Sequence, residues 1–154
     1  MEFTPAGEII GAMHQVRTVK IAGFPQLPDG EFSFVDLHCT NPACDCRKTI
    51  IQVIHKGRVV SMIDYGWETP EYYRKWMGDD DAMATEMAGA SISMESPDLV
   101  RREAILKLFE ALMNERWKMA FKHHYALVKE RLAARSSKGS AAADGREEGG
   151  GAGR

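Results

Sequence analysis

Three cysteines that lie close together are the residues of this chain most able to do chemistry. Cys39, Cys44 and Cys46 occur in the run His38-Cys39-Thr40-Asn41-Pro42-Ala43-Cys44-Asp45-Cys46-Arg47, and the 154-residue sequence has no other cysteine. An odd number argues against a set of disulfides, and a bridge between Cys44 and Cys46 would close a strained ring. Thiolates are preferred ligands of zinc, which takes four tetrahedral donors in structural sites. The run therefore predicts a zinc site with three sulfur ligands.

The fourth ligand has to come from outside this run. His38 precedes Cys39 in an expected strand, so its side chain should point to the opposite face. His55 lies at the far tip of an expected hairpin, and His14 lies in a segment that no pattern assigns. These positions leave the two histidines of the last expected helix.

His124 is the better placed of those two. The residues three and four positions away from it are all apolar: Ala120, Phe121, Leu127 and Val128. A helical residue with such neighbours faces the core, whereas His123 has Arg116 and Glu130 on its side. We predict the ligand set Cys39, Cys44, Cys46 and His124. His123, His38, Asp36 and water are the alternatives for the fourth position, and His124 can also be read as a hydrogen-bonded core histidine.

Other chemistries fit these residues less well. The Cys-x4-Cys interval begins like one iron–sulfur spacing, but the next interval differs and a fourth cysteine is missing. No Ser/His/acid signature, phosphate loop or His-Glu-x-x-His motif occurs. We therefore favour a non-enzymatic accessory or adaptor module with a structural zinc. The alternatives are a zinc-dependent hydrolase, with Asp36, Asp45 or Glu68 as general base, and a thiol-based metal or redox sensor.

The elements that would position the site follow from local patterns. Residues 16–22, 31–39, 49–55 and 58–65 are typical of strands, and Lys56-Gly57 between the last two predicts a hairpin. Thr69-Pro70 predicts a short helix that ends at Gly78. The acidic stretch 79–95 is expected to be a loop, and helices should follow Ser96-Pro97-Asp98 and Asn114-Glu115. Strands followed by helices indicate an α+β fold: a small antiparallel sheet of three or four strands, a cysteine-rich metal loop between strands, and C-terminal helices packed on one face.

Composition limits the domain count and the partners. Residues 1–134 suffice for a single zinc-binding domain, and the Gly/Ala/Ser-rich residues 135–154 predict a disordered tail. A net charge of −2 argues against nonspecific nucleic-acid binding as the function. No stretch is long and apolar enough for a membrane span, and the first residues lack the pattern of a secretion signal. We therefore expect a cytoplasmic protein.

Five aromatic residues gather just before and within the first expected helix. Clusters of this kind usually seal the edge of a core, but tyrosine and tryptophan are also common anchors of protein interfaces. We predict a protein partner that binds through this surface, which consists of Tyr65, Trp67, Tyr72, Tyr73 and Trp76.

The order of these motifs resembles a family of small, largely uncharacterised bacterial proteins. That family has an aromatic-Cys-x-x-Pro-x-Cys-Asp-Cys-Arg loop, a hairpin, a Gly-Trp-Glu aromatic segment and a C-terminal helix with a His-Tyr pair. Here the counterparts are residues 38–47, the segment that begins Gly66-Trp67-Glu68, and His124-Tyr125. The resemblance spans roughly residues 32–129 and implies the architecture and the site, but no reaction. It favours His124 as a ligand, and it disfavours His38, which stands where the family has an aromatic residue.

Overall fold

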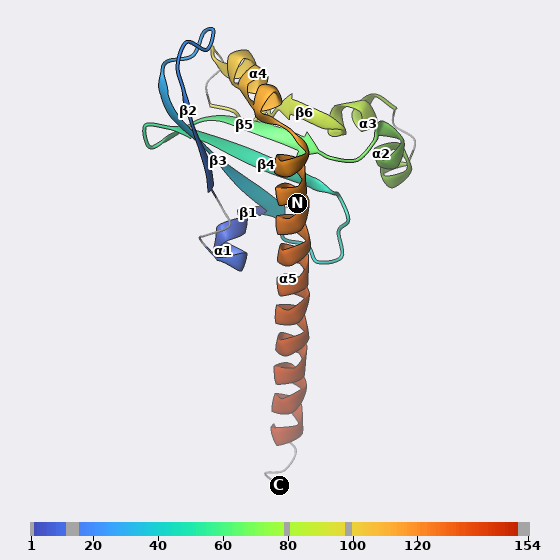
Figure 1. Ribbon diagram of the computed structural model, residues 1–154. Helices are drawn as coiled ribbons and strands as arrows, with labels where there is room; N and C mark the ends of the chain where they lie inside the picture. Colours follow the sequence, from blue (N-terminus) through green and yellow to red (C-terminus); the bar gives the residue numbers. More distant parts are fainter. Residues whose placement is uncertain (1, 12–15, 79–80, 98–99, 151–154) are drawn as a thin grey trace.

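The protein folds as a single antiparallel sheet with helices on it (Figure 1). The computed structural model describes residues 2–11, 16–78, 81–97 and 100–150. Its strands are β1 (Phe3–Pro5), β2 (Val16–Ile21), β3 (Gly30–Cys39), β4 (Lys48–His55), β5 (Arg58–Gly66) and β6 (Gly89–Ile92). Its helices are α1 (Ala6–Ile10), α2 (Pro70–Met77), α3 (Asp81–Met87), α4 (Arg102–Leu112) and α5 (Glu115–Gly150). The predicted α+β class, with C-terminal helices packed on a sheet, is confirmed.

The longest strand, β3, organises the sheet. Its neighbours on one edge are β2, which pairs with residues 30–35, and β1, which pairs with residues 37–39. On its other edge lies β4, followed by β5 and β6, and every pairing is antiparallel. The cysteine run begins at the last residue of β3 and continues through the connection to β4, so the sheet places the loop between two paired strands.

The two faces of the sheet are different environments. Even-numbered residues of β3 and odd-numbered residues of β4 and β5 share one face, because side chains alternate along a strand and the register sets Phe34 opposite Val53 and Ile51 opposite Ile63. This face packs against α4 and α5, and α5 runs across it and well beyond the sheet (Figure 1). The core there includes Phe32, Phe34, Ile51, Val53, Ile63, Ile105, Leu108, Phe109, Trp117 and Phe121.

Local signals set several element ends as predicted. Lys56 and Gly57 form the hairpin turn with φ of 50° and 74°, the left-handed pair that a two-residue turn requires. The Thr69 hydroxyl accepts a hydrogen bond from the Tyr72 N–H, and Gly78 ends α2 with φ of 77°. The Asn114 side chain accepts a hydrogen bond from the Trp117 N–H at the start of α5.

Two predicted elements differ from the structure. The stretch expected to be a loop contains α3 and β6, and β6 extends the sheet by pairing with β5. Helix α4 begins at Arg102 rather than near Ser96, and the Ser96 hydroxyl lies 2.9 Å from that of Ser61. Helix α5 continues to Gly150 and so enters the segment 135–154, for which a disordered tail stays a prediction.

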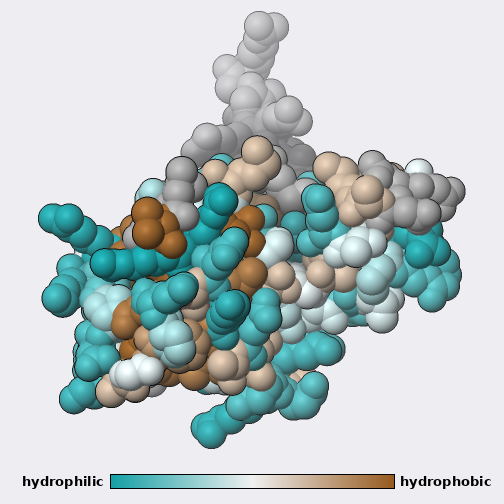
Figure 2. Space-filling view, turned by 90° about the horizontal axis from the view of Figure 1, so that it is seen from above, coloured by the Kyte–Doolittle hydropathy of each residue, from teal (hydrophilic) through white to brown (hydrophobic). Residues whose placement is uncertain are grey.

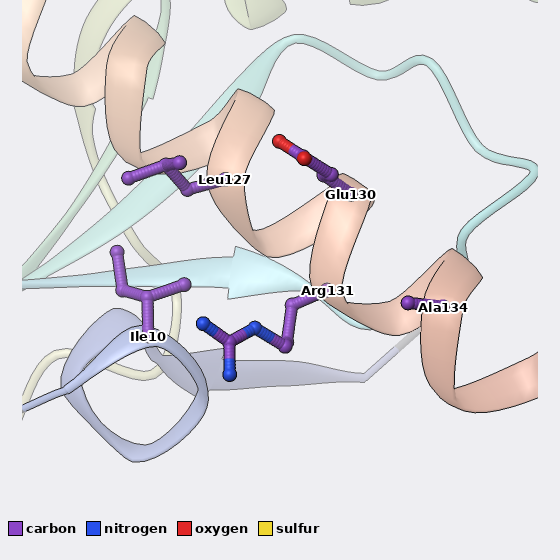
Figure 3. Close-up of a pocket in the computed structure, with 5 residues that line it drawn as sticks. All are labelled: Ile10, Leu127, Glu130, Arg131 and Ala134. Atoms are coloured by element: carbon purple, nitrogen blue, oxygen red, sulfur yellow. The ribbon is translucent and has the colours of Figure 1, made fainter.

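The N-terminal helix lies against α5. A small buried cluster consists of Ala6, Ile9 and Val128, and Leu132 packs beside it. Among the described residues, Leu132 is the last residue of α5 that packs against an apolar cluster. Next to this contact is a shallow hollow of about 310 Å³ (Figure 3), where Ile10 faces Leu127 and the Arg131 side chain extends between the two helices. The contact fixes α5 at the end of the sheet that carries the cysteines.

The surface seen from above has no continuous apolar face. Hydrophobic atoms there lie in small groups between hydrophilic side chains (Figure 2). Within the described part of the chain, no helix combines the length and apolar character needed to cross a membrane.

Candidate metal centre

The three cysteines converge in space. Cys39 lies at the end of β3, and Cys44 and Cys46 lie in the loop that follows. Their Sγ atoms all lie within 4.8 Å of one another, Cys39 and Cys46 are buried, and all three are free thiols. Three thiols at this spacing can hold a metal ion.

Tyrosines from two helices hold the loop in this shape. The Tyr73 hydroxyl on α2 donates to the Arg47 carbonyl over 2.8 Å, and the Tyr72 hydroxyl donates to the Asp45 carbonyl over 2.6 Å. The Tyr125 hydroxyl on α5 donates to the Cys44 carbonyl and accepts from the Arg47 N–H. Because each bond goes to the backbone next to a cysteine, α2 and α5 fix the directions of the thiols.

Arg47 closes the loop at its C-terminal end. It has a φ of 49°, a left-handed conformation that is uncommon for a residue other than glycine. Its guanidinium makes a two-pronged contact with Asp45, at 3.1 and 2.9 Å, and a bond of 3.1 Å to Glu68. The Arg47 hydrogen bonds hold the pKa of the Asp45 carboxyl below its usual value. The Arg47 charge is thus balanced mainly by these two acids rather than by the thiols.

One of the three thiols has a strongly shifted pKa. Burial, together with the neighbouring Cys44 and Cys39, raises the pKa of Cys46 to about 12. A metal that binds here must displace the thiol protons, so acid competes with the metal.

A second cluster lies on the other face of β3. Asp36 Oδ2 lies 2.6 Å from His38 Nε2 and 2.7 Å from His124 Nδ1. All three side chains are buried, and their donor atoms also lie within 4.8 Å of one another. Asp36 and His38 share a face because they are two residues apart in a strand, whereas Cys39 points to the opposite face.

The structure therefore separates the predicted ligands into two groups. Cys39, Cys44 and Cys46 are together, and His124 is hydrogen-bonded to Asp36 in the second group. Among the described residues, no His, Asp or Glu offers a fourth donor within the span of the three thiols. His124 as the fourth ligand remains a prediction, and it would require His124 to give up its bond to Asp36.

The other histidines that the sequence offered lie elsewhere. His123 is exposed on α5. His55 is stacked on Phe32 at the hairpin end, and its Nδ1 lies 3.0 Å from the Glu31 carbonyl oxygen. His14 lies outside the described residues.

Most of the predicted aromatic surface is buried. Tyr65 and Trp67 belong to the main core, and Tyr73 is fully inaccessible. Of the five residues, Trp76 is exposed (39%) and Tyr72 is half-buried. The cluster mainly seals the edge of the core, so a partner could reach only its outer members.

Trp76 borders a groove that the sequence did not indicate. Two adjoining hollows of about 360 and 570 Å³ lie on the face of the sheet opposite α5, and Cys46 lines the first of them. Both hollows are lined by Lys48, Asp64, Met77, Met87 and Met94. We call their combined surface the methionine groove; its remaining lining residues include Trp76, Met83, Glu86 and Glu95.

Comparison of this chain with protein-family models, curated proteins and solved structures finds no match.

Proposed function

We propose that this protein is a small zinc-binding accessory module. Zinc would be held by Cys39, Cys44 and Cys46 and would fix the loop between β3 and β4. The observation that carries the proposal is the convergence of all three cysteines of the chain within 4.8 Å. Four tetrahedral zinc ligands at about 2.3 Å would place the sulfurs about 3.8 Å apart, a separation that lies within the 4.8 Å span of this cluster.

Zinc fits this donor set better than other soft ions. Thiolates select zinc, copper(I) or an iron–sulfur cluster, and such a cluster commonly uses four cysteines where this chain has three. Half-buried Cys44 leaves one side of the site accessible, so water can take the fourth position if His124 keeps its bond to Asp36. Three reduced thiols also suit the cytoplasm predicted from the sequence.

Metal content and thiol reactivity test this assignment. Purified protein should contain zinc, and removing the zinc with a chelator should make three thiols reactive that the metal had protected. Cys44→Ser should lose that protection for the other two thiols, whereas His55→Ala should keep it. Protein that contains no metal and has three reactive thiols as isolated would overturn the zinc assignment and favour a thiol-based sensor.

We further propose that the methionine groove binds a basic, amphipathic segment of a protein partner. Methionine side chains adapt to varied apolar surfaces, and Met94 and Met83 are 102% and 48% exposed. The groove carries three carboxylates, on Asp64, Glu86 and Glu95, against the single ammonium of Lys48. This charge favours a segment with lysine or arginine beside its apolar face.

A pair of synthetic helices tests the groove. One presents a leucine face with lysines beside it, and the control has glutamates in place of the lysines. We expect the basic helix to bind more tightly, with an affinity that falls as salt rises, and we expect Met83→Ser combined with Met94→Ser to weaken binding about tenfold. Met119→Ser on α5, where the side chain is 60% exposed, is the matched control. Equal binding of both helices, or no effect of the double substitution, would refute the proposal.

A further inference from the structure

The cluster on the opposite face of β3 brings together three donor atoms of a kind that binds divalent metals. Asp36 and His38 come from one strand, and His124 comes across the interior from α5. His38 Nε2, His124 Nδ1 and Asp36 Oδ2 point at one another, with exposures of 0%, 8% and 2% for the respective residues. The elements thus hold two imidazoles and a carboxylate around one point in the core.

Among the described residues, the buried carboxylate of this cluster pairs with imidazoles alone. Asp36 is 2% exposed, and its ion pairs are those with His38 and His124, with none to lysine or arginine. Buried charged groups are paired or coordinate metals, and a divalent ion would suit these three donors.

The hydrogen bonding of the cluster is also incomplete. His38 Nδ1 is buried and has no hydrogen-bond partner among the described residues. A buried polar network that serves only to stabilise a core normally satisfies all its members. The open nitrogen therefore argues against a purely structural role for the cluster, and a metal at Nε2 would need an acceptor for the proton that it shifts to Nδ1.

We propose that Asp36, His38 and His124 form a second metal site, which is free of sulfur and takes a divalent transition ion such as Zn²⁺, Co²⁺ or Fe²⁺. Imidazole and carboxylate suit these ions, and three protein donors leave room for a further ligand. Donors about 2.0–2.1 Å from a tetrahedral ion lie about 3.3 Å apart, so the two nitrogen–oxygen pairs, now at 2.6 and 2.7 Å, must open slightly. Rotation of the Asp36 and His124 side chains can supply this change.

The two sites share a strand but not a face, and they differ in chemistry. Cys39 follows His38 directly, yet alternation sends the two side chains to opposite sides of the sheet. The thiol site suits soft ions, and the second site suits borderline ions that prefer nitrogen and oxygen. The two sites can therefore be distinguished in the same molecule.

Cobalt(II) titration of the metal-free full-length chain tests the second site. Cobalt bound to thiolate shows strong charge-transfer absorption in the near ultraviolet, and cobalt bound only by nitrogen and oxygen shows weak visible bands without it. We expect two bound ions per chain. Cys46→Ser should lose the charge-transfer absorption and keep the weak visible bands. Asp36→Asn, which is nearly isosteric with the wild type, should keep the charge-transfer absorption and bind one ion fewer.

Each other outcome has a definite meaning. A single bound ion with thiolate absorption, unchanged in stoichiometry by Asp36→Asn and His38→Gln, would overturn the second site and leave the zinc proposal intact. If His124→Gln loses the thiolate absorption while Asp36→Asn binds cobalt like the wild type, the second site is also overturned. His124 would then be the fourth ligand of the thiol site. Binding without any thiolate absorption, abolished by Asp36→Asn, would support the second site and refute the thiol site. Circular dichroism of each variant establishes that it is folded before its spectrum is compared.

Discussion

Cys46→Ser should remove the zinc of the thiol site and lower the free energy of unfolding by about 4 kcal/mol when free zinc exceeds its dissociation constant about a thousandfold. The side chain is 1% exposed, and its sulfur is one of the three that converge. A ligand that binds only the folded chain stabilises it by mass action, so loss of a thiolate removes most of that term. Chemical denaturation at fixed free zinc, followed by circular dichroism, measures the change.

A thermodynamic cycle separates the metal from packing. In excess chelator Cys46→Ser should cost only about 1–3 kcal/mol, the cost of burying a hydroxyl in place of a thiol, because the metal term is then absent from both proteins. Returning zinc should stabilise the wild type alone. If Cys46→Ser costs as much in chelator as in zinc, the cysteine contributes through packing and the metal proposal fails.

The parts of the fold that follow from short stretches of sequence were predicted well. The Lys56-Gly57 turn and the Thr69 and Asn114 caps are local, because each depends on residues within a few positions. The convergence of the cysteines is also nearly local, since the three lie within one short loop. In each case the sequence distance is small enough for spacing to determine geometry.

The fourth ligand depends instead on which face of the sheet α5 covers, and His124 stays a prediction for that position. The apolar neighbours of His124 correctly placed it toward the interior, where it is buried. They could not show that α5 packs on the face of Asp36 and His38 rather than on that of Cys39. The i, i+2 spacing of Asp36 and His38 was a usable signal for the second cluster, since it puts two donors on one face of a strand.

Burial of the aromatic cluster was likewise decided by contacts distant in sequence. Trp67 packs edge-on against Tyr125 of α5 with ring centroids 5.1 Å apart, and the Tyr73 hydroxyl bonds to Arg47. The sequence shows five aromatic residues close together, but it does not show which of them the helix and the cysteine loop will cover. Trp76, one turn beyond Tyr72 on α2, is the one that is left exposed.

Gly66→Ala should destabilise the protein by about 3 kcal/mol, at the upper end of the cost of overpacking, and should also weaken metal retention. Gly66 ends β5 beneath α2, and a Cβ there would overlap the Met87 carbonyl oxygen and lie 2.5 Å from the Tyr73 hydroxyl oxygen. That hydroxyl donates to the Arg47 carbonyl next to Cys46, so displacing it also loosens the cysteine loop. Thermal unfolding and zinc content of the variant measure the two effects.

Two comparisons isolate the steric cause. Gly23→Ala is the matched control: a Cβ there meets no atom within 4 Å, although its φ of 70° is left-handed, so it should cost only about 1 kcal/mol. Tyr73→Phe alone removes one hydrogen bond worth about 1 kcal/mol and one of the atoms that the new Cβ would strike. The double variant Gly66→Ala with Tyr73→Phe should therefore lose less stability than the sum of the two single losses. For residues in direct contact, we expect the difference to be about 1 kcal/mol or more. Strict additivity of the two effects would mean that a Cβ at Gly66 is opposed by the Met87 carbonyl oxygen and not by Tyr73. Gly66 would then support the strand–helix contact without acting on the metal loop.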